Sequence, residues 1–206
     1  MVWELGMTGA RKQADERTAF AIGYIEQLKS VLDAMPWNEL SSVIEALEKA
    51  HADDRQVFIA GNGGSAATAS HMACDLMLTT PKTGGKGFRV IALTDNVAAI
   101  TAAGNDESYT DVFVAQMRTL ANEGDVIILI SGSGNSENAV RAAEFAKARS
   151  MGVFGFLGMG GGALAPLCDR AVIVPSNNYG PIEDAHMIFD HLITAYFHKW
   201  LNPNNA

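Results

Sequence analysis

Five short apolar runs divide the second part of the chain, and each one leads through small residues toward a segment with helical periodicity. The runs are QVFIAG (56–61), FRVIALTD (88–95), DVIILISG (125–132), MGVFGFLG (151–158) and RAVIVPS (170–176). Strands that are apolar at nearly every position are buried on both faces, which is typical of a parallel sheet covered by helices on each side. The pattern therefore predicts an α/β fold with an open, doubly wound sheet of five parallel strands flanked by helices. Ligands of such sheets bind beyond the carboxyl ends of the strands.

Two helices are expected before the first strand, and a long helix is expected after the last one. Apolar residues recur at helical spacing from about Asp15 to Met35 and again from Asn38 to His51. Pro36 separates these two segments, because proline ends or interrupts a helix. The last apolar-rich segment, about 182–201, predicts a long C-terminal helix.

The length and the apolar content suit one globular domain. The chain has 206 residues, of which 48% are hydrophobic, and this is enough to bury a substantial core. No internal repeat or interdomain linker interrupts the sequence. We therefore expect a single domain over residues 1–206, with an N-terminal helical segment at about 15–51 and a sheet core at about 55–200.

The charge balance and the cysteine count argue against several classes of protein. A formal net charge of −8 disfavours nucleic acid and anionic membranes as partners, because both attract basic surfaces. The N-terminal segment holds no apolar run that could act as a signal peptide, and no later segment reaches the roughly 20 apolar residues of a membrane span. Cys74 and Cys168 are too few for a disulfide framework and are expected to be reduced thiols. We expect a soluble, cytoplasmic protein that binds neither nucleic acid nor membranes.

The stretch FIAGNGGSAATASHMACDL (58–76) passes from the first predicted strand into a glycine-rich turn and then into a helix. Gly61, Gly63 and Ala66 fit the G-x-G-x-x-[GA] pattern of a dinucleotide site. Such a site needs an acidic residue about 20 positions further on, and Asp95 comes about ten residues later than that. Glycines also serve strand-to-helix turns for backbone reasons alone. The loop could therefore be a phosphate cradle, a dinucleotide site or a plain turn.

A second loop of the same kind, SGSGNSEN (131–138), follows the third predicted strand. It gathers Ser131, Ser133 and Ser136 just before a helix that is expected to begin near Glu137. Backbone amides at a helix start attract anions, and serine hydroxyls donate to phosphate oxygens without adding positive charge. One serine would be enough to cap the helix. Three serines in this position predict a phosphate site in an acidic protein.

His71 and Asp75 lie four residues apart on the helix after the first loop, so their side chains share one face. Together they could ligate one metal ion or flank one carbon atom of a substrate. About two helical turns, roughly 10 Å, separate them from the loop, which suits a sugar that extends away from its phosphate. A bare His/Asp pair at this spacing is more often a surface pair, so its position is what favours a functional role.

Glu183 and His191 are candidates for the same site from the last predicted helix. They are eight residues apart and therefore lie within about 80° of each other in projection. Other ionisable side chains nearby compete with them: Asp184, His186 and Asp190. The residues alone do not select His191 over His186 or His198.

In five segments the sequence resembles the sugar isomerase (SIS) domain family and, within it, the phosphoheptose isomerases. The segments are GNGGSAATASH, ALTDN, AAGNDESYTDVFVAQ, ISGSGNSEN and PIEDAHMIFDHLI. The resemblance covers about residues 55–200. It implies a phosphorylated sugar as substrate and a homotetramer with active sites at the subunit borders.

The resemblance also implies roles for individual residues. The positions of Asp75, Glu183 and His191 carry a glutamate, a glutamine and a histidine in the family. The expected zinc ligands are His71, Asp75, Glu183 and His191. The expected contacts to the phosphate and to the rest of the sugar are Asn62, Gly63, Ser65, Asp95, Asn96, Ser131, Ser133, Ser136 and Glu183.

Isomerisation of a ketose phosphate moves a proton between adjacent carbons through an enediol, which requires a base at carbon and an acid at oxygen. Asp75 and His191 are the expected catalytic pair. One zinc ion per chain would polarise the carbonyl group as a Lewis acid. Asp75 could act as base, as ligand or as both. The expected reaction converts sedoheptulose 7-phosphate into a heptose 7-phosphate.

Four positions depart from the family pattern and leave the identity of the sugar open. Asp75 is one methylene shorter than the family glutamate, and Glu183 adds a charge where the family has glutamine. Gly132 replaces a threonine, and Gly180 stands where heptose isomerases have an aspartate. We expect the phosphate site to tolerate these changes. The alternatives are an isomerase of another phosphosugar and a non-catalytic SIS protein that acts as a sugar-phosphate sensor or a protein-binding tetramer, with a nicotinamide dehydrogenase more distant.

Overall fold

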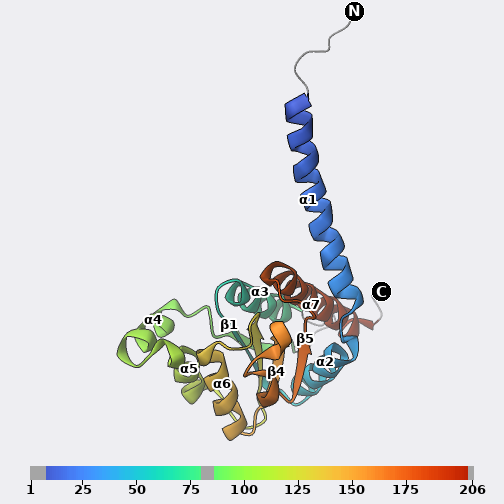
Figure 1. Cartoon of the computed structure of the whole chain (residues 1–206). Coiled ribbons are helices and arrows are strands. Elements are labelled where there is room, and N and C mark those ends of the chain that lie inside the picture. The colour runs from blue at the N-terminus through green and yellow to red at the C-terminus, as the bar shows by residue number, and fades with distance from the viewer. Residues whose placement is uncertain (1–7, 80–85, 204–206) are drawn as a thin grey trace, which may run out of the picture.

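A sheet of five strands lies between layers of helices in the computed structural model, which describes residues 8–79 and 86–203 (Figure 1). The longer elements in chain order are α1 (Thr8–Asp33), α2 (Trp37–Ala52), β1 (Gln56–Gly61), α3 (Gly64–Leu78), β2 (Arg89–Ala92), α4 (Val97–Asp106), α5 (Val112–Leu120), β3 (Val126–Ser131), α6 (Glu137–Ala148), β4 (Gly152–Leu157), β5 (Arg170–Ile173) and α7 (Tyr179–Trp200). Short 3-10 helices occupy Tyr109–Asp111, Met159–Gly161 and Ala165–Leu167.

The predicted sheet is confirmed, with five parallel strands in the order β2-β1-β3-β4-β5. Val57 of β1 pairs with Val90 of β2 on one side and with Val126 of β3 on the other. The chain therefore reverses its direction of winding after β2. The loops that leave β1 and β3 open side by side at the carboxyl edge of the sheet, which is the switch point where ligands of open α/β sheets bind.

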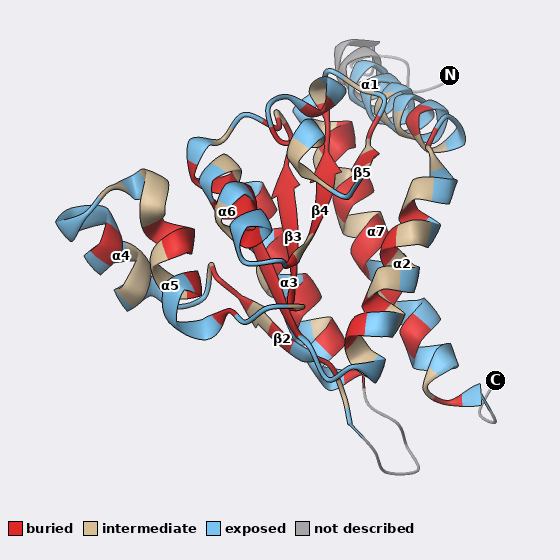
Figure 2. Ribbon diagram, turned by 90° about the horizontal axis from the view of Figure 1, so that it is seen from below, coloured by how far each residue is buried: buried red, intermediate tan, exposed pale blue. Residues whose placement is uncertain are grey.

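The core lies on both faces of the sheet, because the side chains of each strand alternate between the two faces (Figure 2). Val57 and Ile59 of β1 pack with residues of α2, α3 and α7, whereas Phe58 and Ala60 pack with residues of α5 and α6. All six residues of β1 are buried. This two-sided burial is the reason that the strands are apolar at nearly every position.

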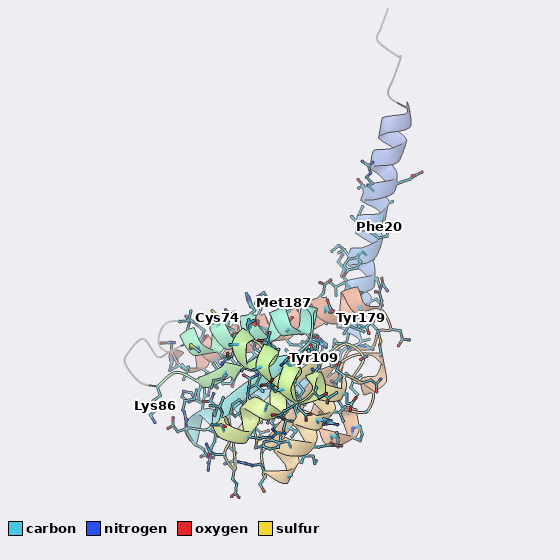
Figure 3. The ribbon with its side chains drawn as sticks, turned by 90° about the vertical axis from the view of Figure 1, so that its left-hand side faces the viewer. Phe20, Cys74, Lys86, Tyr109, Tyr179 and Met187 are labelled. Atoms are coloured by element: carbon cyan, nitrogen blue, oxygen red, sulfur yellow. The ribbon has the colours of Figure 1, made fainter. Side chains whose placement is uncertain are left out.

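The N-terminal helices are present, and α1 begins earlier than the sequence pattern indicated. It runs from Thr8 rather than from about Asp15, and it extends away from the body of the molecule (Figure 1). Its apolar side chains are largely uncovered: Phe20 is 78% exposed, Ile22 57% and Ile25 48%. Figure 3 shows Phe20 on this projecting helix. Of the helices that the structure describes, none is long and apolar enough to cross a bilayer.

Candidate active site

Glycine shapes the loop between β1 and α3. Gly63 has a φ of 56°, in the left-handed region that favours glycine. A Cβ atom on Gly61 would lie 2.7 Å from the carbonyl oxygen of Ser65, so no larger residue fits there. The turn lets α3 begin at Gly64 and places the buried Ser65 in its first turn. The start of α3 is therefore held at the carboxyl edge of the sheet, where a helix can offer amides to an anion.

The loop between β3 and α6 carries serine hydroxyls that can still donate. Ser131 Oγ accepts a hydrogen bond from the amide of Gly134 at 3.0 Å, and Ser133 Oγ accepts one from the amide of Asn135 at 3.2 Å. Each hydroxyl that accepts from the backbone keeps its own hydrogen for another partner. Ser136 is the N-cap residue of α6, but its hydroxyl makes no capping bond. The interpretation that these serines merely cap the helix is therefore wrong for Ser136.

A pair of amide side chains joins the two loops. Asn62 and Asn138 exchange two hydrogen bonds, each of 2.9 Å, and the hydroxyl of Tyr109 donates to Asn62 Oδ1 at 3.0 Å. Asn138 is 3% exposed, so its amide is sequestered from water. The predicted substrate contact Asn62 thus uses its side chain to hold the loops together. Asn138 and Tyr109 were not predicted in this role, although both lie within the segments that carry the family resemblance.

Two side chains of the loop after β2, those of Asp95 and Asn96, form hydrogen bonds within the protein. The carboxylate of Asp95 accepts hydrogen bonds from Ser70 of α3 and from Thr94. Asn96 caps α4, since its side-chain oxygen accepts from the amide of Ala99 at 3.0 Å. Asp95 is therefore tied to α3, whereas Asn96 secures the start of α4.

Tyrosine rings fill the space beside two glycines that depart from the family pattern. A Cβ atom on Gly132 would lie 2.9 Å from the ring of Tyr179, and one on Gly180 would lie 2.7 Å from the hydroxyl of Tyr24. Tyr24 also donates a hydrogen bond to Asp184 of α7. Figure 3 shows Tyr109 and Tyr179 on the same side of the molecule. A larger residue at either position would require the neighbouring tyrosine side chain to move.

Helices α3 and α7 bring four candidate ligands together. Each of His71, Asp75, Asp190 and His191 offers one ligand atom, and these atoms all lie within 4.8 Å of one another. The Nε2 atoms of His71 and His191 are 3.2 Å apart, and Asp75 Oδ2 lies 3.6 Å from His71 Nε2. His71 is 47% exposed and Asp75 30%, so the cluster is open to solvent on the side of α3.

Asp190 lies at the buried side of this cluster. Its side chain has no exposed surface, its Oδ1 accepts from Thr194 at 3.4 Å, and its Oδ2 has no hydrogen-bond partner. Burial, reinforced by the charge of Asp75, raises the pKa of Asp190 to about 6. An ionised carboxylate in such a place needs a compensating charge. A divalent cation would supply that charge, and two imidazoles with two carboxylates form a suitable donor set for zinc.

Glu183 is not among the four grouped side chains, although the family resemblance implies that it is a zinc ligand. Its carboxylate lies against the start of α3, where a Cβ atom on Gly64 would come within 2.5 Å of Glu183 Oε2. The structure thus groups three of the four expected ligands and adds Asp190 to them. Sequence spacing had identified Asp190 only as a competitor, because it directly precedes His191.

The three histidines of α7 have different surroundings. His191 belongs to the cluster, whereas His186 is 1% exposed and its Nε2 lies 3.3 Å from the carbonyl oxygen of Leu157. Burial lowers the pKa of His186 to about 4. His198 is exposed in the last turn of the helix. Of these three, the geometry favours His191 for chemistry.

These features define a doubly wound α/β protein with a candidate anion site at its switch point and a candidate metal centre on α3 and α7. The chain belongs to the SIS domain family, whose model matches residues 23–158, and within that family to the phosphoheptose isomerases. The resemblance predicted from the sequence motifs is confirmed.

The relatives cover most of the chain. It is 41% identical over 152 residues to a phosphoheptose isomerase of Nitratiruptor sp., covering 74% of this chain and 79% of the relative. It is 37% identical over 180 residues to a phosphoheptose isomerase of Clostridium acetobutylicum, covering 86% and 90%. The solved structure of a phosphoheptose isomerase from Francisella tularensis superposes with a TM-score of 0.82 at 28% identity, covering 91% of this chain and 98% of that one.

Proposed function

We propose that this protein is a phosphoheptose isomerase that converts sedoheptulose 7-phosphate into a heptose 7-phosphate. One observation carries the proposal: a single helix, α3, begins at the glycine-rich loop with Ser65 and carries His71 and Asp75 of the His/Asp cluster. His71 and Asp75 follow Ser65 by six and ten residues, which is about 9 and 15 Å along the helix. A sugar held by its phosphate at the loops could therefore place its other end at the cluster.

The phosphate group is proposed to bind between the two loops. Ser65, Ser131, Ser133 and Ser136 would donate hydroxyl hydrogens, and the starts of α3 and α6 would add backbone amides. Such a site needs no lysine or arginine, which agrees with the net charge of −8. Gly63 would allow the backbone to approach the ligand closely, while the Asn62–Asn138 pair would keep the loops at a fixed separation.

The reaction requires one base and one acid at the carbonyl end of the sugar. Asp75 is the proposed base: its carboxylate takes a proton from carbon 1 of the ketose, and the released electron pair forms the double bond of the enediol. The carbonyl oxygen receives a proton in the same step. Return of a proton to carbon 2, with loss of the hydroxyl proton from oxygen 1, gives the aldose. Asp75 suits this role because it is partly exposed and lies on the open side of the cluster.

The cluster is proposed to hold one zinc ion, with His71, Asp75 and His191 as ligands and a fourth ligand from α7. A bound divalent ion would polarise the substrate carbonyl as a Lewis acid. His191 Nε2 points at His71 Nε2, so ligation through Nε2 leaves the other ring nitrogen, Nδ1, to carry a proton for the acid step. Asp95 and Glu183, at the edges of the same region, are proposed to contact the sugar hydroxyls.

The active protein is proposed to be a single-domain homotetramer with active sites at the subunit borders. Three exposed apolar side chains of α1 support an oligomer: Phe20, Ile22 and Ile25. Clusters of exposed apolar side chains usually mark a surface that packs against another chain. Sedimentation measurements on the wild type and on Phe20→Glu test this part. A wild-type monomer would contradict it.

Incubation of the purified protein with a panel of ketose phosphates, with and without a chelator, tests the proposed function. Product NMR should show an aldose formed from sedoheptulose 7-phosphate, and the chelator should abolish its formation. Turnover of a different ketose phosphate alone would identify an isomerase of another phosphosugar. Tight binding of sugar phosphates without turnover would instead support a non-catalytic sensor.

A further inference from the structure

We propose that Tyr24 of α1 is a specificity-determining residue of the sugar site, where its hydroxyl oxygen accepts a hydrogen bond from a hydroxyl group of the bound sugar. The inference rests on the proposed function and adds a contact at the first turn of α7. The ligand that this contact selects is a sugar phosphate with hydroxyl groups on the carbons near its phosphate.

Tyr24 lies where α1 reaches the body of the molecule. Between residues 15 and 30 of this helix, every residue is exposed except Tyr24 and Leu28, which are half-buried. These two residues are four apart and therefore share one face of the helix. Helix α1 contacts α7, and Tyr24 binds Asp184 of that helix. The face of α1 that carries Tyr24 is thus turned toward α7.

The hydroxyl of Tyr24 occupies the space in which a side chain at position 180 would begin. It donates a hydrogen bond to Oδ2 of Asp184 at 2.5 Å, and a Cβ atom on Gly180 would lie 2.7 Å from it. The first turn of α7 therefore receives from α1 a polar atom that its own residue 180 does not supply. A phenol oxygen that donates its hydrogen can still accept through its lone pairs. Because Asp184 takes the hydrogen, the oxygen is left as an acceptor for a ligand.

Asp184 also keeps the phenol neutral. Its hydrogen bond, followed by burial and by the charges of Asp184 and Glu183, raises the pKa of Tyr24 to about 12. The hydroxyl therefore keeps its hydrogen at neutral pH, and its oxygen meets a ligand as a neutral acceptor.

The first turn of α7 lies beside both loops of the proposed phosphate site. The ring of Tyr179 lies against Gly132 of the serine loop, and the carboxylate of Glu183 lies against Gly64 at the start of α3. Gly180 stands between these two contacts in the sequence. The turn that the hydroxyl from α1 touches is therefore the turn that meets both loops.

Helices α3 and α7 run side by side in the same direction from this end. Glu183 lies beside Gly64, and His191 lies beside His71, seven to eight residues or roughly 10–12 Å further along. Tyr24 contacts α7 around residues that flank Glu183, at the end nearer the loops. The hydroxyl groups that Tyr24 would meet are therefore those near the phosphate rather than those beside the carbonyl.

Calorimetry on the full chain tests this contact with two ligands that cannot be isomerised. A heptitol 7-phosphate, the reduced form of the heptose phosphate, keeps the hydroxyl groups of the sugar, whereas methyl phosphate has none on carbon. Tyr24→Phe should weaken binding of the heptitol 7-phosphate by about three- to tenfold, as expected for the loss of one neutral hydrogen bond. Its affinity for methyl phosphate should stay within about twofold of the wild type.

Two further variants make the test specific. Tyr196→Phe is the matched control, because it removes the hydroxyl of another tyrosine that binds a carboxylate, that of Glu48. It should leave both affinities unchanged. Gly180→Ala places a Cβ atom against the hydroxyl of Tyr24 and should cause the same selective loss for the heptitol 7-phosphate without removing the hydroxyl. Circular dichroism checks that each variant is folded, and Gly180→Ala decides the question if Tyr24→Phe does not fold.

The contact would be refuted by wild-type affinity for the heptitol 7-phosphate in Tyr24→Phe, or by an equal loss for both ligands. An equal loss would mean that Tyr24 supports the fold around the phosphate rather than the sugar. Turnover of sedoheptulose 7-phosphate is measured separately on the wild type. A wild type that isomerises while Tyr24→Phe binds the heptitol 7-phosphate normally would refute this contact and leave the proposed function intact. A selective loss in Tyr24→Phe without wild-type turnover would support the contact and refute the isomerase.

Discussion

Replacing His186 with glutamine should remove a pH dependence from the folding stability of this protein. His186 is a buried residue of α7 whose ring packs against the rings of Phe156 and Phe189. Its Nε2 can donate to the carbonyl oxygen of Leu157, which leaves Nδ1 as the unprotonated nitrogen, and Nδ1 is buried without a partner. Protonation would create a charged ring whose new N–H finds no acceptor. Burial thus keeps this histidine neutral in the folded state.

The size of the effect follows from the pKa of His186, which burial lowers from 6.5 to about 4. The unfolded chain binds a proton below about pH 6.5 and the folded chain only below about pH 4, so stability is lost as the pH falls between these values. The full difference in the free energy of unfolding is about 3 kcal/mol, at about 1.4 kcal/mol per pKa unit. Between about pH 7.5 and about pH 5, His186 should account for a loss of about 2 kcal/mol.

Urea unfolding followed by circular dichroism at these two pH values measures the effect. The wild type should lose about 2 kcal/mol more than His186→Gln on going to the lower pH. His198→Gln, which removes an exposed histidine of the same helix, should behave like the wild type. Equal pH dependence in the wild type and in His186→Gln would refute the claim that His186 is held neutral, and with it the distinction drawn between His186 and His191.

Five further substitutions probe the two ends of the site and the packing beside it. Asp75→Asn should lower kcat by at least about 10²-fold with little change in KM, and unchanged turnover at equal zinc content would exclude Asp75 as the base. Ser65→Ala and Ser136→Ala should each weaken sugar-phosphate binding by about 1–3 kcal/mol in calorimetry, and undiminished affinity in both would remove the phosphate site from the loops. Gly132→Ala should destabilise the fold by about 1 kcal/mol, since its Cβ meets the Tyr179 ring, which is half exposed and can give way. Tyr179→Ala should relieve that loss in a double-mutant cycle, and an equal loss in both backgrounds would contradict the crowding.

The number of strands and their parallel pairing could be predicted from the sequence. Burial on both faces makes such strands apolar along most of their length. A strand such as β3 (Val126–Ser131) is apolar at almost every position, and glycine and serine mark the point where it ends. The extent of α1 was less predictable. Residues 15–23 of this helix are all exposed, so no core-facing periodicity marks where it begins.

The sequence predicts the location of a site residue well when that residue directly follows a strand of the parallel sheet. Ser65 and Ser136 follow β1 and β3, so parallel pairing alone brings them to one edge of the sheet. The donor set on α7 depends instead on how that helix is rotated against α3. Spacing puts Glu183, Asp190 and His191 on one broad face, and only the packing of the two helices selects Asp190 for the cluster.

Proton transfer through an enediol at the His/Asp cluster is the central claim, and isomerisation in deuterated water tests it most directly. Zinc-loaded protein and sedoheptulose 7-phosphate are incubated in deuterium oxide, and the product is followed by proton NMR. We expect the wild type to form a heptose 7-phosphate that carries solvent deuterium at carbon 2, and we expect Asp75→Asn to form none. A wild-type protein that binds the sugar phosphate but forms no aldose and exchanges no carbon-bound hydrogen would contradict it.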